Sequence, residues 1–166
     1  MTKVASKHWH GCANTETGCP PALSLIETRR MPAADPFFDT NVVLYLLSGD
    51  EAKAERAQLL LESGGVVSVQ VLNKFASVAL GKKAVDFLEV REILSILRAV
   101  CTVKPLDLET HELGLDVAER YRFSIYDSMI IAAALKARCS ILYTEDLSSG
   151  QRIEALTVCD PFTPRP

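Results

Sequence analysis

The chain has 166 residues, 48% of them hydrophobic, which is enough to bury one sizeable core and too few for two ordinary domains. Its formal charge of -3 and its sequence pI near 5.6 argue against a protein that grips nucleic acid through bulk positive charge. If the protein acts on nucleic acid, metal ions must therefore help it.

The five cysteines are odd in number and widely spread, and some stand in apolar runs such as 139–143. This distribution does not resemble a disulfide framework, so a reducing compartment is expected. The first residues contain no apolar stretch long enough for a secretory signal or a membrane span. We therefore expect a cytoplasmic protein with no membrane partner.

Residues 1–34 are expected to form a flexible extension. They show no helical or strand periodicity and mix Gly, Asn and Thr with several prolines. Met31 directly precedes the first organised segment, so it is an alternative start of the native product. The folded domain is predicted over 35–166.

A chain that begins at Met31 is expected to unfold with unchanged cooperativity and a nearly unchanged thermal midpoint. The reason is that residues 1–30 offer no apolar face to bury. Thermal melts of the full and the shortened chain, followed by circular dichroism, check this expectation. A midpoint lowered by several degrees would show that the extension packs on the domain.

From Pro36 onward, short apolar runs alternate with amphipathic stretches, the pattern of strands that are followed by helices. Strands are predicted at 37–39, 66–69, 100–103, 141–144 and 156–158. Helices are predicted at 41–48, 50–63, 69–80, 84–99, 108–121 and 126–138. Strands separated by such crossovers pair in parallel, so the fold class is predicted to be α/β, with a mainly parallel sheet covered on both faces.

The ends of several predicted helices carry local signals. Asp50 and Ser68 are the expected N-caps of the second and third helices, because their side chains can accept a hydrogen bond from the first turn. Glycines at 64 and 81 mark the ends of the same two helices. The last helix has no polar residue between Met129 and Leu135, so it should be deeply buried.

Three aspartates stand where predicted strands meet helices. Asp39 ends the first strand, Asp146 follows the fourth, and Asp127 opens the buried helix. Ligands of open parallel sheets bind outside the carboxyl ends of the strands, so all three side chains can face one cleft. Side chains alternate along a strand, so Thr144 and Asp146 share a face and Glu145 points away. Carboxylates without His or Cys nearby suit Mg²⁺ or Mn²⁺ rather than zinc.

Each aspartate also has an alternative role, because Asp is favoured at helix N-termini for its capping bond and its charge. Asp127 lies three residues after Ser124, the spacing of a capping box. Asp39 can start its helix, and Asp146 can open the turn at 147–150. Three such charges at one sheet edge need compensating positive charge, and a metal ion supplies it.

Four runs of the sequence closely resemble the motifs of PIN domains, especially those of VapC-like toxins of type II toxin–antitoxin systems. They occur in order at 37–41, 67–73, 126–134 and 142–146, and the resemblance spans about 35–162. It implies a PIN-like three-layer α/β/α fold and a Mg²⁺- or Mn²⁺-dependent endoribonuclease that cleaves RNA. It also implies a homodimer and a small antitoxin protein that binds over the active site.

The same resemblance assigns roles to individual residues. Asp39, Asp127 and Asp146 take the places of three catalytic, metal-binding acids. Asn41 and Thr144 are expected to support the site. These assignments agree with the positions of Asp39 and Asp146 at predicted strand ends and of Asp127 at the start of the buried helix.

One position departs from the family pattern. The predicted helix 69–80 carries in this family a glutamate that completes the acidic cluster, and Lys74 stands in its place. An ammonium group beside the three aspartates would compete with Mg²⁺ for them and weaken or abolish catalysis. Alternatively, the Lys74 side chain extends outward and the remaining acids still hold one ion.

Two other functions stay open. A catalytically impaired PIN domain, with Lys74 in place of the acidic residue, would act as an RNA- or antitoxin-binding module. A phosphatase would use the segment 39–41 as the start of a phospho-aspartate motif, but such enzymes need a second acid where Asn41 stands. A metal-dependent nuclease assay separates the enzyme from the binding module.

Overall fold

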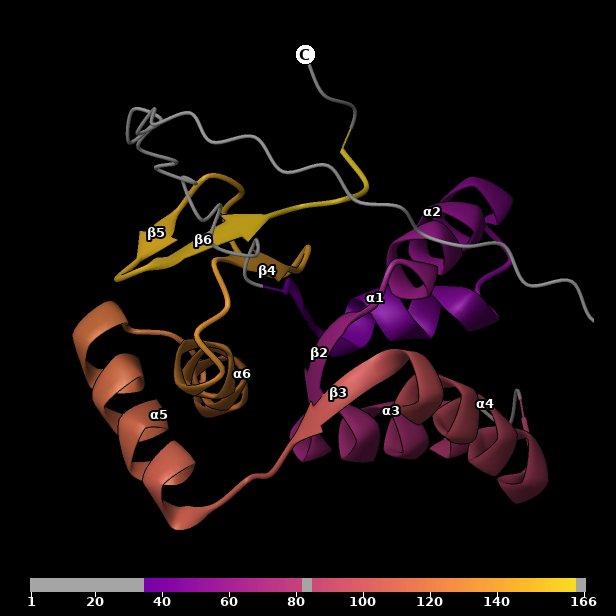
Figure 1. Cartoon of the computed structure of the whole chain (residues 1–166), viewed down its shortest axis with the longest axis horizontal. Helices are drawn as coiled ribbons and strands as arrows, with labels where there is room; N and C mark the ends of the chain where they lie inside the picture. Colours follow the sequence, from indigo (N-terminus) through magenta and orange to yellow (C-terminus); the bar gives the residue numbers. More distant parts are fainter. Residues whose placement is uncertain (1–34, 82–84, 164–166) are drawn as a thin grey trace, which may run out of the picture. The chain divides into compact units, whose positions relative to one another are not determined.

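A mainly parallel sheet forms the centre of the domain in the computed structural model, which describes residues 35–81 and 85–163. The predicted extension at 1–34 lies outside the described residues. The strands are β1 Phe37–Phe38, β2 Gly65–Ser68, β3 Cys101–Lys104, β4 Ile141–Tyr143, β5 Arg152–Ile153 and β6 Leu156–Cys159. Their order in the sheet is β3-β2-β1-β4-β6-β5, and β5 pairs with β6 in the antiparallel sense while the other pairs are parallel (Figure 1).

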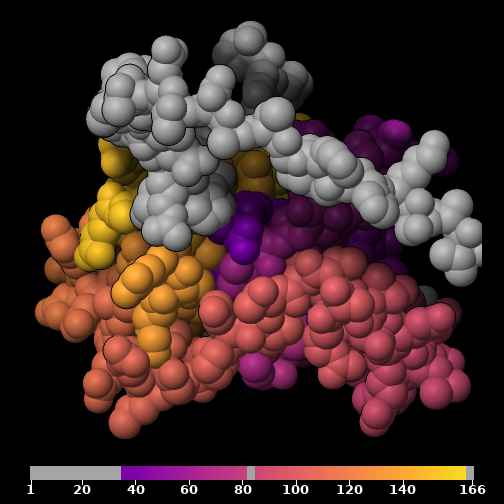
Figure 2. Space-filling view, viewed as in Figure 1, coloured from indigo at the N-terminus to yellow at the C-terminus, as the bar shows by residue number. Residues whose placement is uncertain are grey.

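Helices cover both faces of this sheet. They are α1 Thr40–Leu44, the 3₁₀ turn η1 Tyr45–Leu47, α2 Glu51–Glu62, α3 Val69–Gly81, α4 Phe87–Val100, α5 Leu108–Tyr121 and α6 Ile125–Lys136. In Figure 1, α5 and α6 lie together on one side of the strands and α1 to α4 lie on the other. The outer surfaces of α4 and α5 are visible on the face shown in Figure 2. The predicted fold class and three-layer α/β/α arrangement are thus confirmed.

The predicted elements occur close to their expected places, with two differences. The short strand β5 was not expected, because two residues are too few to show an alternating pattern. The expected capping role of Ser68 is wrong: its hydroxyl is buried and has no hydrogen-bond partner among the described residues. Ser68 is still part of the sheet, where it pairs with Lys104 of β3, and α3 begins directly after it. Asp50 does cap α2, accepting a hydrogen bond from the Lys53 backbone N–H at 3.2 Å.

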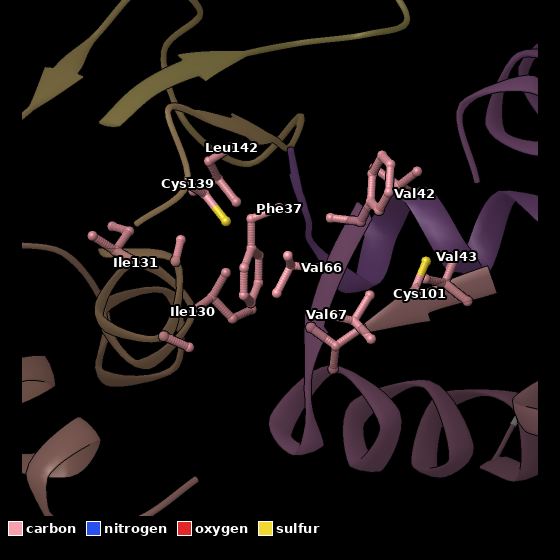
Figure 3. Packing of buried hydrophobic residues seen from close by; sticks show 14 of the residues in the cluster. Phe37, Val42, Val43, Val66, Val67, Cys101, Ile130, Ile131, Cys139 and Leu142 are labelled. Carbon is pink, nitrogen blue, oxygen red and sulfur yellow. The ribbon is translucent and has the colours of Figure 1, made fainter. Parts of the chain in front are cut away.

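The core lies on both sides of the central strands. Figure 3 shows Phe37 and Val66 directed toward Ile130 of α6, whereas Val42 lies on the other side. All residues from Ser128 to Ala134 are buried, so the predicted burial of this helix is confirmed. Each large apolar side chain that is fully buried contributes about 1.5–3 kcal/mol, so this packing fixes the position of α6 beside the sheet. Within the described residues, no helix is both long and apolar enough to cross a membrane.

Gly65 begins β2 at a place with no room for a side chain. A Cβ atom there would overlap Cε2 of Phe38 and lie 2.7 Å from the carbonyl oxygen of Pro36. That carbonyl accepts the Val66 N–H at 2.8 Å, so the backbone cannot move away without losing this bond. Gly65→Ala is therefore expected to lower the free energy of unfolding by about 2–3 kcal/mol, measured by urea denaturation.

The matched control for this substitution is Gly49→Ala. No atom lies within 4 Å of a Cβ built at Gly49. The control is expected to keep or slightly raise the stability, because alanine restricts the unfolded chain. Equal losses in the two variants would contradict the steric explanation.

Candidate active site

Asp39 stands at the carboxyl end of the central strand β1, as the N-cap of α1. Its carboxylate accepts hydrogen bonds from the Thr40 backbone N–H and, at 2.8 Å, from the Thr144 hydroxyl. The residue is only 3% exposed. This burial raises the pKa of Asp39, although both hydrogen bonds act in the opposite direction. A carboxylate with so little access to water is costly to ionise, which favours a functional role such as binding a cation.

The Thr144 hydroxyl organises the surroundings of Asp39. It donates to Asp39, and it accepts from Asn41 Nδ2 and from the Asp146 backbone N–H, each at 3.1 Å. One donated and two accepted bonds use the full capacity of a hydroxyl group. Thr144 therefore ties the end of β4 to the start of α1 and fixes the orientation of the Asp39 carboxylate. The side-chain oxygen of Asn41 is buried and has no partner among the described residues.

Two charged side chains act on Asp39. The ammonium group of Lys74, on α3, lowers the pKa of Asp39, and the carboxylate of Asp146 raises it. The structure thus brings Asp39, Asp146 and Lys74 into one electrostatic group, with Asn41 and Thr144 beside it. The positive charge of Lys74 thus acts on Asp39 from the position where this sequence departs from the family pattern.

Glu145 belongs to a different group of side chains. Its carboxylate accepts a hydrogen bond from the Tyr45 hydroxyl at 2.8 Å and pairs with the Lys53 ammonium at 3.3 Å. The ammonium group also lies 4.4 Å from the centre of the Tyr45 ring. Glu145 therefore links the end of β4 to α2, whereas its neighbours Thr144 and Asp146 interact with Asp39.

Asp127 is held at the N-terminus of α6. Ser124 is the N-cap of this helix: its Oγ accepts the Asp127 N–H at 3.2 Å and donates to Asp127 Oδ2 at 2.7 Å. Ser124 is therefore the cap of α6, and the Asp127 side chain bonds the Ser124 hydroxyl rather than its backbone N–H, so only the serine half of the expected capping box is present. Over residues 35–81 and 85–163, no three His, Cys, Asp or Glu side chains are grouped closely enough to hold a metal ion. The three predicted acids do not form one cluster in this conformation.

The two carboxylates of Asp39 and Asp146 still fit one kind of metal. Mg²⁺ prefers hard oxygen ligands, and proteins commonly hold it with one or two carboxylates while water and phosphate complete its shell. A buried acid next to a second acid meets this requirement, whereas it does not provide the closed cage that a structural ion needs. The donor set is therefore suited to a weakly held Mg²⁺ or Mn²⁺.

Two hollows border this group of residues. One, of about 370 Å³, lies between α3 and α6 and is lined by Gln70, Asn73, Lys74, Ser77, Val78 and Tyr126. The other, of about 260 Å³, is lined by residues that include Asn41, Tyr45 and Glu145, and Val78 contributes to both. Tyr126 and the polar face of α3 were not among the site residues predicted from the sequence. The signal was available, because polar residues at 70, 73, 74 and 77 recur at the spacing of one helix face.

Comparison with known protein families identifies the domain. A family model described as the PIN domain matches residues 37–149. The chain belongs to the PIN domain family. The matched range of this PIN domain contains Asp39, Lys74, Asp127 and Asp146, and the predicted resemblance is thereby confirmed.

Solved structures share the fold of this PIN domain at low sequence identity. VapC20 of Mycobacterium tuberculosis, described as a sarcin–ricin loop cleaving toxin, has a TM-score of 0.55 and 18% identity, over 66% of this chain and 88% of that chain. A toxin–antitoxin complex from Klebsiella pneumoniae has a TM-score of 0.59 and 17% identity, over 76% and 98% of the two chains. FitAcB from Neisseria gonorrhoeae has a TM-score of 0.52 and 17% identity, also over 76% and 98%. A comparison with curated proteins gave no match.

Proposed function

We propose that this PIN domain is a metal-dependent endoribonuclease of the toxin–antitoxin type, and that Lys74 weakens its activity. The observation that carries the proposal is the buried carboxylate of Asp39, at the carboxyl end of the central strand and within electrostatic reach of Asp146. Membership of the PIN family supports the reaction class. The likeness to VapC20, a toxin that cleaves the sarcin–ricin loop, supports RNA as the substrate.

Asp39 and Asp146 would hold Mg²⁺ or Mn²⁺. Asp127, whose Oδ2 accepts a hydrogen bond from the Ser124 hydroxyl, would contribute Oδ1 as a further ligand. When bound, such an ion lowers the pKa of a water molecule and neutralises charge that develops on a phosphate group. The task of the protein is positioning: Thr144 keeps the Asp39 carboxylate in one orientation, and Asn41 keeps Thr144 in place.

Lys74 acts against the metal. Its ammonium group lowers the pKa of Asp39, so it favours the ionised carboxylate that would bind the ion and competes with the ion for it. A divalent ion must overcome the attraction between the ammonium group and the carboxylate before it binds there. We therefore propose that the protein needs more Mg²⁺ or Mn²⁺ than a PIN domain that carries glutamate at this position.

The test is a nuclease assay of the full chain on labelled single-stranded RNA across a range of Mn²⁺ and Mg²⁺ concentrations. The rate of cleavage is expected to rise with metal concentration and to level off only at high metal concentration. Cleavage should stop when EDTA is added. Cleavage that continues in EDTA would contradict metal dependence. Absence of cleavage at every metal concentration, in a variant that lacks Lys74 as well, would contradict the enzymatic proposal.

The second candidate function is a binding module without catalysis. It is favoured because the described residues contain no cluster of three metal-binding side chains, and Asp127 is not among the charges that act on Asp39. Such a domain would bind RNA or an antitoxin while leaving RNA intact. Binding with no cleavage under any of the metal conditions above is the result that this alternative expects.

We also propose a cognate antitoxin partner and a homodimer, acting in the cytoplasm. The solved structure from Klebsiella pneumoniae, which shares the fold, is a toxin–antitoxin complex. Cys101 and Cys139 are buried as free thiols, and burial raises the pKa of each to about 11, which keeps them unreactive in a reducing compartment.

A further inference from the structure

The hollow between α3 and α6, which we call the α3–α6 groove, is lined mainly by polar side chains. Its lining comprises Gln70, Asn73, Lys74, Ser77, Val78 and Tyr126, and its volume is about 370 Å³. That volume lies within the range of protein pockets that hold small ligands. One wall is a polar face of α3, and the opposite wall is an aromatic side chain of α6.

The aromatic wall is Tyr126, whose side chain is one of the large apolar groups that the fold leaves exposed, at 65%. It lies in the first turn of α6, next to Asp127. An exposed aromatic ring that faces a cation and uncharged polar groups is typical of sites for single-stranded nucleic acid, where a base stacks on the ring and the phosphate meets the cation. The polar wall offers such groups in Lys74, Asn73 and Ser77.

The groove adjoins the candidate active site. Val78 lines both the groove and the second hollow, which Asn41 also lines, and Lys74 of the groove acts by its charge on Asp39. A phosphate near the Lys74 ammonium would therefore lie close to the acids that are proposed to bind the metal ion. A base attached to that nucleotide would extend toward Tyr126.

We infer that the α3–α6 groove binds one unpaired nucleotide of the RNA, next to the phosphate that is cleaved, with its base stacked on Tyr126. The inference rests on the proposed ribonuclease function and adds to it a structural class of substrate. Because a base that is paired inside a helix does not expose its face, the nucleotide must come from a single strand, a loop or a bulge. Stacking tolerates every base, so Tyr126 selects for the unpaired state rather than for sequence.

The experiment measures binding of the full chain to a short fluorescent single-stranded RNA by anisotropy, in EDTA so that the RNA stays intact. Tyr126→Ala is expected to weaken binding by about tenfold or more, whereas Tyr126→Phe keeps the ring and the affinity. The matched control is Phe87→Ala on α4, an aromatic side chain of similar exposure, 68%, that does not line the groove. This control is expected to bind RNA as the unchanged chain does.

A second arm removes the base instead of the ring. RNAs with one abasic nucleotide at successive positions are expected to include one that binds the unchanged chain about tenfold more weakly. With that RNA, Tyr126→Ala should cause no further loss, because the base that it would stack on is absent. Additive losses for the ring and the base would overturn the stacking contact.

The remaining outcomes separate this inference from the proposed function. No binding of RNA by the unchanged chain, or equal binding by Tyr126→Ala, overturns the groove. So does a change in oligomeric state in Tyr126→Ala with unchanged RNA affinity, since it would show that a second copy of the chain covers the groove. If binding depends on Tyr126 but neither the unchanged chain nor Lys74→Glu cleaves RNA at any Mn²⁺ concentration, the groove stands as a site for an unpaired nucleotide, with no cleaved phosphate beside it, and the nuclease proposal fails. If Lys74→Glu cleaves RNA and the addition of Tyr126→Ala leaves the KM for RNA unchanged, the nuclease proposal stands and the groove fails.

Discussion

Lys74→Glu is expected to raise the affinity for Mn²⁺ by at least about tenfold and to raise the kcat of RNA cleavage with it, whereas the KM for RNA should rise because the α3–α6 groove loses its cation. The substitution removes a cation that acts on Asp39 and adds a carboxylate at the same place, so the local charge changes by two units. A tenfold change in affinity corresponds to roughly 1.4 kcal/mol, and both the loss of the ammonium group and the added carboxylate favour binding of a cation. Calorimetric titration with Mn²⁺ and an RNA cleavage assay on the same samples check the two effects.

Two controls separate the causes of this effect. Lys74→Gln removes the competing cation without adding a ligand, so it should give a smaller gain than Lys74→Glu. Arg91→Glu makes the same change of charge at an exposed position of α4 and should leave both measurements unchanged. If the unchanged chain is already fully active and Lys74→Glu adds nothing, Lys74 does not compete with the metal ion.

Growth of cells gives an independent readout of the same substitution. Cells that express Lys74→Glu without an antitoxin are expected to stop growing, whereas cells that express the unchanged chain should tolerate it. The reason is that metal capture, which Lys74 opposes, is needed for RNA cleavage. Equal growth with both proteins, despite equal expression, would argue against toxicity that depends on this position.

The fold could be predicted from the sequence because its signals are local. Short apolar runs, the cap at Asp50 and the apolar stretch of α6 each indicate an element without reference to the rest of the chain. The failure at Ser68 has a tertiary cause. Whether this residue ends a strand or caps a helix depends on the register of β2 against β3, which the sequence of one segment does not contain.

The candidate site could be predicted only in part. Asp39, Thr144 and Asp146 stand at strand ends, and the carboxyl ends of parallel strands meet at one sheet edge, so their proximity follows from topology. For Asp127 the sequence allowed both a role at the helix N-terminus and a role as a metal ligand. The sequence does not contain the side-chain rotamer, which in the structure bonds Asp127 to the Ser124 hydroxyl. Tyr126 was missed because an exposed aromatic residue acquires meaning only from the neighbour that faces it across the groove.

Asp39→Asn is expected to abolish binding of Mn²⁺ while keeping or raising the thermal midpoint by a few degrees at about pH 8. Burial raises the pKa of Asp39 above its ordinary value of 3.8, so the folded state holds this proton more tightly than the unfolded state does. The contribution of Asp39 to stability therefore falls as the pH rises through the window between the unfolded and the folded pKa, and above it the buried charge lowers stability. Asparagine carries no charge, and its oxygen can still accept one of the two hydrogen bonds.

The advantage of Asp39→Asn over the unchanged chain should therefore shrink as the pH is lowered toward 3.8, where Asp39 becomes protonated in both states. Asp116→Asn, which removes the same charge from an exposed position on α5, should change neither the metal affinity nor this pH dependence. Melts over a range of pH and calorimetric titrations with Mn²⁺ measure the two effects. Equal Mn²⁺ binding by Asp39→Asn and the unchanged chain would mean that Asp39 only caps α1. Loss of Mn²⁺ binding together with a marked fall in stability at every pH would mean that the Asp39 carboxylate stabilises the fold. A carboxylate whose role is to bind the metal ion should instead lower the stability of the metal-free folded state.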